Sequence, residues 1–224
     1  MHIKKIIASV FVVAAMSSLA QEVKVKEASE GFSNGSHNAL SVEVFVDDLS
    51  KVQKEWKSKM KDFGYGDAKD KGKDYDFDNV KFKDLSNNPM DVYTHFEELK
   101  GEKAVRVNAA FDMGGDYISS GKHGKEFDYM KKMMHEFALK TSKEYVEDQY
   151  KDAHKILVRF QDKQKDLEKD NKDLENDIVN YKDKIKKAED NITKNKADIE
   201  TKKKEIELQQ KATDVIKAKL ESIK

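Results

Sequence analysis

The sequence predicts an α+β protein: a small, four-stranded, largely antiparallel sheet with helices on one face, followed by a long C-terminal coiled-coil helix. Three observations carry this prediction. Alternating and amphipathic segments follow one another in the order β-α-β-β-β-α between residues 39 and 145. Neither glycine nor proline occurs after Gly124. A heptad repeat of apolar residues continues from Val146 to the C-terminus.

The first twenty residues have the pattern of a secretory signal peptide. Lys4 and Lys5 precede an apolar run over residues 6–16, which is too short to cross a bilayer as a stable helix. Small residues near its end predict cleavage between Ala20 and Gln21. We therefore expect a periplasmic or secreted bacterial protein with no transmembrane segment in the mature chain.

Composition narrows the classes of partner and cofactor. Loss of the two signal-peptide lysines leaves 41 basic and 43 acidic side chains, so the mature chain has no net basic charge for nucleic acid. The chain contains no cysteine, which excludes disulfides, thiolate ligands and an acylated N-terminal cysteine. The charged fraction of 38% exceeds the roughly 25% of ordinary globular domains, as a solvated coiled coil requires.

The mature chain should begin with a flexible leader, followed by a strand and then a helix. Residues 21–38 are polar and rich in glycine and serine, and we interpret them as a flexible leader. Residues 39–46 alternate and predict a strand that opens a small α/β domain over residues 39–145. Apolar residues spaced three and four apart then predict a helix from Leu49 to Phe63, with Asp47 or Asp48 as its N-cap.

Three further strands follow in the prediction. A charged turn over residues 67–74 leads into a strand over residues 75–85, irregular at Asp78-Asn79. Residues 92–99 and 104–111 form a hairpin. In its second arm the apolar residues face inward, whereas Arg106 and Asn108 face outward.

The long helix should begin near Lys125 and first pack on the sheet. Phe127, Met130, Met134 and Phe137 form one helical face ahead of the heptad repeat. We assign this face to the core of the domain; a methionine-rich surface for clients is the alternative.

The heptad region over residues 146–224 supplies the predicted coiled-coil core. With Ile178 placed at position a, 17 of the 23 a and d positions are apolar. The predicted core consists of Leu157, Phe160, Leu167, Asn171, Leu174, Ile178, Tyr181, Ile185, Ile192, Ile199, Ile206, Ile216, Leu220 and Ile223.

The same region favours a parallel homodimer. Isoleucine occupies five consecutive a positions, and Asn171 at a sets register in a parallel pair. Four g-to-e pairs between the helices are attractive and one is repulsive. An antiparallel hairpin that folds near residues 190–196 remains an alternative, as do a trimer and an unpaired helix.

No motif in the chain predicts catalysis, a cofactor or a metal. His135-Glu136 begins like a zinc-protease helix, but Leu139 stands where the second histidine is required. Asp74, Asp76 and Asp78 have the spacing of half a calcium loop, yet the closing glutamate is missing, so a solvated acidic strand edge is the better interpretation. We expect a protein without enzymatic activity.

Three stretches resemble uncharacterised secreted proteins of Bacteroidetes. These are Asp84–Ser86, Pro89–Tyr93 and Ala109–Ser120, which lead into the long charged helix. The Ala20-Gln21 edge is also common in signal peptides of that group. The resemblance implies a lineage and a compartment, and no activity. In layout alone, the chain is similar to periplasmic chaperones of the Skp type.

These observations leave three functional hypotheses. The first is a non-enzymatic structural or adaptor protein of the envelope, an oligomerisation spacer that pairs with itself and contacts another envelope protein. The second is a holdase chaperone that grips clients with helical arms. The third is a sheet domain that binds a small ligand or a peptide. Exposed apolar residues outside a and d are few, which favours the first hypothesis.

Overall fold

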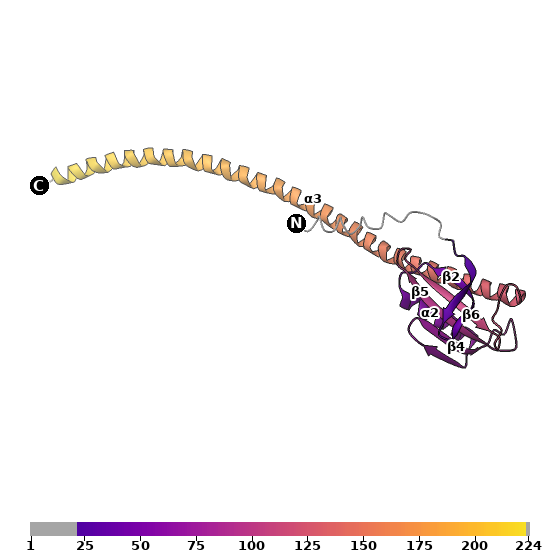
Figure 1. Cartoon of the computed structure of the whole chain (residues 1–224). Coiled ribbons are helices and arrows are strands. Elements are labelled where there is room, and N and C mark those ends of the chain that lie inside the picture. The colour runs from indigo at the N-terminus through magenta and orange to yellow at the C-terminus, as the bar shows by residue number, and fades with distance from the viewer. Residues whose placement is uncertain (1–21, 223–224) are drawn as a thin grey trace. The chain divides into compact units, whose positions relative to one another are not determined.

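The computed structural model describes residues 22–222 and separates into two compact units (Figure 1). Unit 1 ends at Asp152 and holds the sheet domain, and unit 2 begins at Ala153. The predicted boundary at residues 145 and 146 thus falls seven residues early. The signal peptide, the Ala20-Gln21 cleavage site and Ile223 lie outside the described residues.

Unit 1 is an α+β domain built on a single antiparallel sheet, as predicted. The sheet has six strands in the order β1-β2-β6-β5-β4-β3, not the four that the sequence suggested. Its elements are β1 (Val25–Phe32), β2 (Gly35–Val44), α2 (Leu49–Phe63), β3 (Asp67–Asp70), β4 (Asp74–Val80), β5 (Met90–Leu99), β6 (Ala104–Asp112) and the start of α3 (Gly124–Ser222).

The prediction of a flexible leader was wrong. Residues 25–32 form β1, which pairs along its length with β2 around a tight turn at Ser33-Asn34. Gly35 follows that turn at φ 129°, a conformation that side chains disfavour. Serine and asparagine are common in turns and glycine is favoured at the last turn position, so this turn signal outweighs the polar composition of the segment.

The charged turn over residues 67–74 was also misassigned. Its first part forms the edge strand β3, which pairs with β4. The side chains of β3 are mostly exposed, so no apolar alternation marked it as a strand.

The helix was predicted correctly, and the irregular strand was predicted in position but ends at Val80 and not at residue 85. Helix α2 spans Leu49–Phe63, and the Asp48 side chain caps it by accepting a hydrogen bond from the Lys51 amide. Gly64 ends it at φ 75°. In β4 the pairing register shifts between Phe77 and Val80, and Asn79 has φ 58°.

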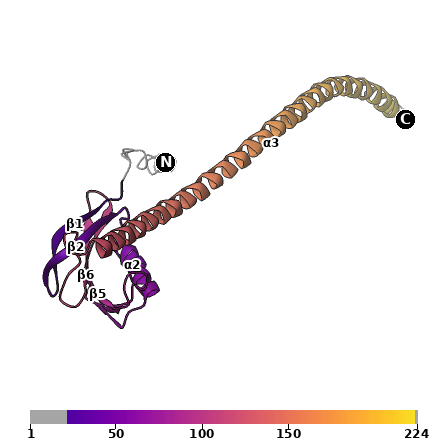
Figure 2. The same cartoon turned by 90° about the vertical axis from the view of Figure 1, so that its right-hand side faces the viewer.

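Both helices pack on the same face of the sheet, as predicted (Figure 2). Trp56 of α2 is fully buried between this face and α3. Its indole Nε1 donates to Thr94 Oγ1 of β5 at 2.9 Å, and its ring meets Phe137 of α3 edge-on at 4.9 Å. Phe127, Met130 and their neighbours on α3 complete this core.

Helix α3 runs without a break through residues 190–196, where the antiparallel hairpin requires a turn. That alternative is therefore excluded. Within residues 22–222, no helix is both long and apolar enough to cross a membrane.

Candidate functional site

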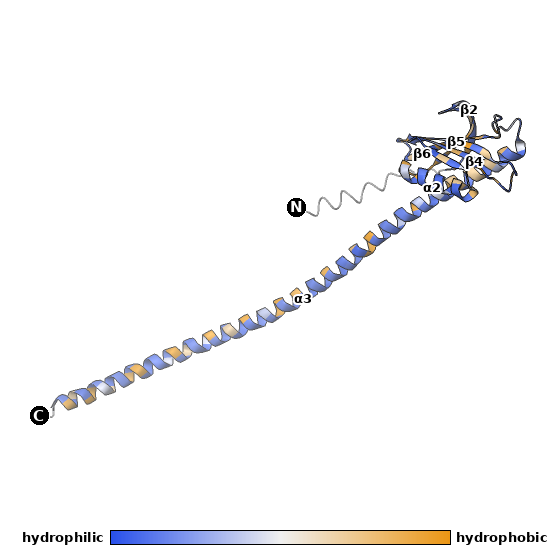
Figure 3. Cartoon of the chain, turned by 90° about the horizontal axis from the view of Figure 1, so that it is seen from below, coloured by the Kyte–Doolittle hydropathy of each residue, from blue (hydrophilic) through white to orange (hydrophobic). Residues whose placement is uncertain are grey.

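The predicted coiled-coil core residues lie on α3 in unit 2 and are exposed. Figure 3 shows hydrophobic positions recurring along a helix that is otherwise hydrophilic. Leu157 is 51% exposed, Ile178 53% and Ile206 60%. We call this row the seam. The described large apolar members of the seam are Leu157, Phe160, Leu167, Leu174, Ile178, Tyr181, Ile185, Ile192, Ile199, Ile206, Ile216 and Leu220.

The seam is flanked by charged residues that remain in solvent. Its own ion pairs are local, such as Lys203 with Glu200 at 2.7 Å and Lys202 with Glu205 at 2.5 Å, one turn apart on the helix. Such pairs stabilise an isolated helix by a few tenths of a kcal/mol each. They do not cover the seam, so unit 2 presents an apolar strip without a partner within the described chain.

The methionines of α3 do not form a client surface within the described domain. Met130, Met133 and Met134 are 5% exposed or less and belong to the core beneath the sheet. Trp56 is likewise a core residue. Neither these methionines nor Trp56 is exposed to bind a ligand.

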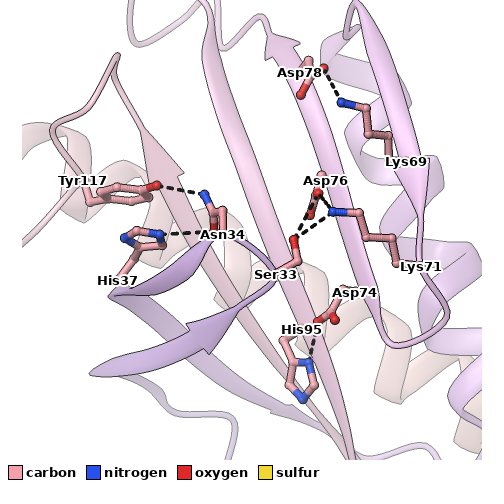
Figure 4. Close-up of polar contacts among 10 residues, drawn as sticks. All are labelled: Ser33, Asn34, His37, Lys69, Lys71, Asp74, Asp76, Asp78, His95 and Tyr117. Carbon is pink, nitrogen blue, oxygen red and sulfur yellow. Dashed lines mark hydrogen bonds and ion pairs between the residues drawn. The ribbon is translucent and has the colours of Figure 1, made fainter.

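The sheet face opposite the helices, which we call the open face, carries rows of cross-strand ion pairs. His95 Nδ1 lies 2.6 Å from Asp74 Oδ1, Lys71 Nζ lies 2.5 Å from Asp76 Oδ2, and Asp78 lies farther from Lys69 (Figure 4). The three aspartates of β4 each face a basic partner, so they do not converge on one point. Among residues 22–222 no cluster of histidine and carboxylate side chains has the arrangement of a metal site.

Asp76 departs from the predicted solvated acidic edge because the β1–β2 turn covers it. Ser33 Oγ donates to Asp76 Oδ2 at 3.3 Å, and Lys71 Nζ also bonds to Ser33 Oγ at 2.9 Å. The Asp76 side chain is consequently only 9% exposed. This contact joins the turn after β1 to β4, although three strands lie between them in the sheet order.

Two stacked aromatic rings lie beside the β1–β2 turn that covers Asp76. We call the turn and these rings the cover. Asn34 donates from Nδ2 to the Tyr117 hydroxyl at 3.2 Å, and its Oδ1 lies 3.2 Å from His37 Nε2. The rings of His37 and Tyr117 stack at 3.9 Å, with 9° between their planes. Burial raises the pKa of the Tyr117 hydroxyl above its ordinary value.

Asn108 was predicted to face outward into solvent, but it is buried. Its side chain is on the open face, as expected, yet it is only 2% exposed, and Ala39 and Ala110 on the same face are buried too. The sheet coils so that β1 returns into contact with β5. The open face is thus partly enclosed by its own hairpin.

Sequence reasoning missed the residues that form this cover. Ser33, Asn34 and His37 lie in the segment interpreted as a leader, and Tyr117 lies in a glycine-containing loop. The Asn34-Gly35 turn signal was the only local clue, because the partners Asp76 and Tyr117 are 43 and 83 residues away.

Comparisons of this chain with protein-family models, with curated proteins and with solved structures found no match.

We expect the Ser33–Asp76–Lys71 contact to stabilise unit 1. Asp76→Ala should lower the free energy of unfolding by about 1–3 kcal/mol, because a buried carboxylate and its hydrogen bonds are lost. Asp78→Ala is the matched control on the same strand. Its ion pair with Lys69 spans 3.7 Å and is exposed, so the loss should be about 0–1 kcal/mol. Urea unfolding measures both, and equal losses would contradict the assignment.

Proposed function

We propose that this chain is a non-enzymatic, exported structural protein of the bacterial envelope. Its C-terminal helix pairs in parallel with that of a second copy, and the paired helices act as a spacer or adaptor that carries two sheet domains. The sheet domain contacts a further envelope protein. Export rests on the signal-peptide pattern of residues 1–20.

The seam carries this proposal. Its members occupy a and d positions of a repeat that keeps one frame throughout unit 2, and each is about half exposed or more. Burying one such side chain stabilises by about 1.5–3 kcal/mol relative to exposure. These dozen residues occupy a and d positions, which alternate at a mean spacing of 3.5 residues, so the row fits another helix with the same repeat.

A second copy is the partner that the charges favour. In a parallel pair, Asp177 lies opposite Lys182, Lys184 opposite Glu189, and Asp198 opposite Lys203. Lys163 and Glu168 form the fourth attractive pair, whereas Asp170 meets Glu175 as the one repulsive pair. The isoleucines at a favour two strands, and Asn171 meets its own copy only when the helices are parallel and in register.

The distribution of apolar residues favours helix pairing over the gripping of unfolded clients. A client-binding arm needs apolar residues on several faces of the helix. C-terminal to Phe160, only Val179, Leu208 and Val215 are clearly apolar outside the a and d positions of the described helix. These three residues are too far apart to form a surface.

A cysteine at Ile199 tests the parallel pair, because the natural chain has no thiol. In the parallel dimer, two copies of an a residue meet at the same level, within the range of a disulfide. Mild oxidation of Ile199→Cys should therefore link most of the protein into a covalent dimer, which non-reducing electrophoresis measures.

Lys204→Cys is the matched control, since position f lies on the outside of the pair. It should link at least several-fold less under the same conditions. A monomer in sedimentation together with no link at Ile199→Cys would overturn the proposed pairing and the spacer function.

A further inference from the structure

A groove lies between the free edge of the sheet and the start of α3, wholly within unit 1. It is open to solvent and has a volume of about 520 Å³. One wall is the edge segment Val23–Lys26, and the other is formed by Asp128, Lys131, Lys132 and His135. Those four helix positions follow the spacing i, i+3, i+4 and i+7, so one helical face lines the groove along two turns.

Val25 and Lys26 of the first wall belong to β1, whose outer backbone is open. β1 is the terminal strand of the sheet and pairs only with β2 among the described strands. Its outer side makes no backbone hydrogen bond to another residue within the range 22–222. Strands at an edge present N–H and C=O groups that a further extended chain pairs with. Natural edges are commonly blocked by proline, a bulge or charged side chains. β1 has no proline and no bulge, and the charge of its Lys26 is one that an acidic strand would neutralise.

Basic side chains dominate the groove. Lys24, Lys26, Lys131, Lys132 and His135 line it, against the single carboxylate of Asp128.

Two of these lysines form ion pairs with acidic residues that do not line the groove. Lys24 pairs with Glu22 at 2.7 Å, and Lys132 approaches Glu136 at 3.9 Å; both pairs are exposed to solvent. Lys26 and Lys131 form no ion pair with another residue in the range 22–222. The groove therefore retains uncompensated positive charge beside the apolar side chains of Val23 and Val25.

We propose that this groove binds an extended acidic segment of a partner protein, which adds to β1 as a seventh strand. Backbone hydrogen bonds to β1 supply the pairing, as in other cases of strand addition. Side chains alternate along a strand, so acidic residues on one face of the segment meet Lys131 and Lys132 of α3 beside Val25, and side chains on its other face lie near Lys24 and Lys26. This inference does not depend on pairing of the seam, because the groove lies wholly within unit 1.

Fluorescence anisotropy tests the proposal with labelled eight-residue peptides added to the chain from Gln21 to Lys224, the expected exported form. One probe alternates valine with glutamate, and the control probe alternates valine with lysine. The acidic probe should bind at least about tenfold more tightly than the basic one, since several charge pairs reverse sign. Equal binding of the two probes would overturn the proposal.

Charge reversal locates the site. Lys131→Glu with Lys132→Glu should weaken binding of the acidic probe by about tenfold. Lys81→Glu with Lys83→Glu is the matched control, because both lysines are exposed and neither lines the groove. It should change the affinity by less than about twofold. Equal weakening by both pairs would indicate attraction to the whole domain and overturn the groove assignment.

Backbone methylation distinguishes strand addition from charge attraction alone. Two versions of the acidic probe carry N-methyl groups on alternate residues, the odd ones or the even ones. In a paired strand, alternate N–H groups point to opposite sides, so only one version should lose binding. Hydrogen exchange should also slow at Val23–Ala28 when the unmethylated probe binds. Equal affinity of both versions, or self-association through β1 that the probe does not displace, would overturn the proposal.

Discussion

A chain that ends at Lys122 should not fold, whereas residues 22–152 should unfold in one cooperative transition. Truncation at Lys122 removes the α3 residues that complete the core of unit 1: Phe127, Met130, Met133, Met134, Phe137 and Ala138. Deleting one large buried side chain costs about 2–5 kcal/mol. Several such losses together exceed the stability of about 5–15 kcal/mol that a domain has in total.

Polar contacts bind the same part of α3 to the sheet domain. Ser142 Oγ accepts a hydrogen bond from the Phe45 amide at 2.9 Å. The Tyr145 hydroxyl donates to Asp47, and this bond, together with burial, raises the pKa of Tyr145. Lys51 pairs with Asp148 at 3.3 Å. The segment after Lys122 is therefore part of the domain up to Asp152.

The point variant Phe137→Ala is the finer test. It should destabilise residues 22–152 by about 3–5 kcal/mol, because the ring is buried against Trp56. Leu167→Ala in the full chain is the control, since it alters only unit 2 and should leave the sheet-domain transition unchanged. Thermal and urea unfolding followed by near-ultraviolet circular dichroism report on Trp56. Equal stability of the fragments ending at Lys122 and Asp152 would refute this role of α3.

Periodicity explains which elements were predictable. Helix α2 buries helically spaced apolar residues and β5 buries alternate residues, so their sequences carry the period of the structure. In β6 the large apolar residues alternate in sequence, although both faces of the strand are buried. The face of α3 from Phe127 to Phe137 was visible for the same reason. These segments place both helices on one face of the sheet.

The two edge strands lacked that signal. β1 has few apolar residues, and β3 consists of Asp67, Ala68, Lys69 and Asp70. Both are stabilised by pairing with a neighbouring strand, and their side chains are largely exposed. The cover over Asp76 depends on a contact 43 residues away in sequence. Local patterns do not encode such distant contacts, so the sequence predicted four strands and a solvated edge.

The heptad repeat is a local pattern, and its role as a coiled-coil core stays a prediction. Its residues are on α3, in the expected order, over the whole described part of unit 2. The proposed partner of the heptad repeat is a second helix. The sequence constrains that partner only through charged residues beside the seam and through the residue types at position a. Experiments on the seam therefore decide the proposed function.

The variant Ile185→Asp with Ile192→Asp should convert the protein from dimer to monomer. Both residues occupy a positions at the centre of the isoleucine run. In a parallel pair, each substitution replaces two facing isoleucines with two facing carboxylates. Losing a buried isoleucine costs about 2–5 kcal/mol, and unpaired carboxylates in an apolar contact add to that cost.

Loss of pairing should also reduce helicity. Isolated helices in water are marginal, and the local ion pairs along α3 contribute only a few tenths of a kcal/mol each. We expect sedimentation to give the monomer mass, and the circular dichroism signal at 222 nm to fall and lose its dependence on concentration. The sheet-domain transition should not change, because its core contains no residue beyond Ala153.

Lys187→Asp with Lys194→Asp is the matched control for this variant. These lysines have the same seven-residue spacing and lie in the same part of the helix, but they occupy c positions on its outer face. The control carries at least as large a change in net charge, so charge alone does not separate the two variants. If the seam pairs, only the isoleucine variant becomes monomeric. A natural chain that is already monomeric at micromolar concentration, or two variants that behave alike, would show that the exposed seam does not join two copies.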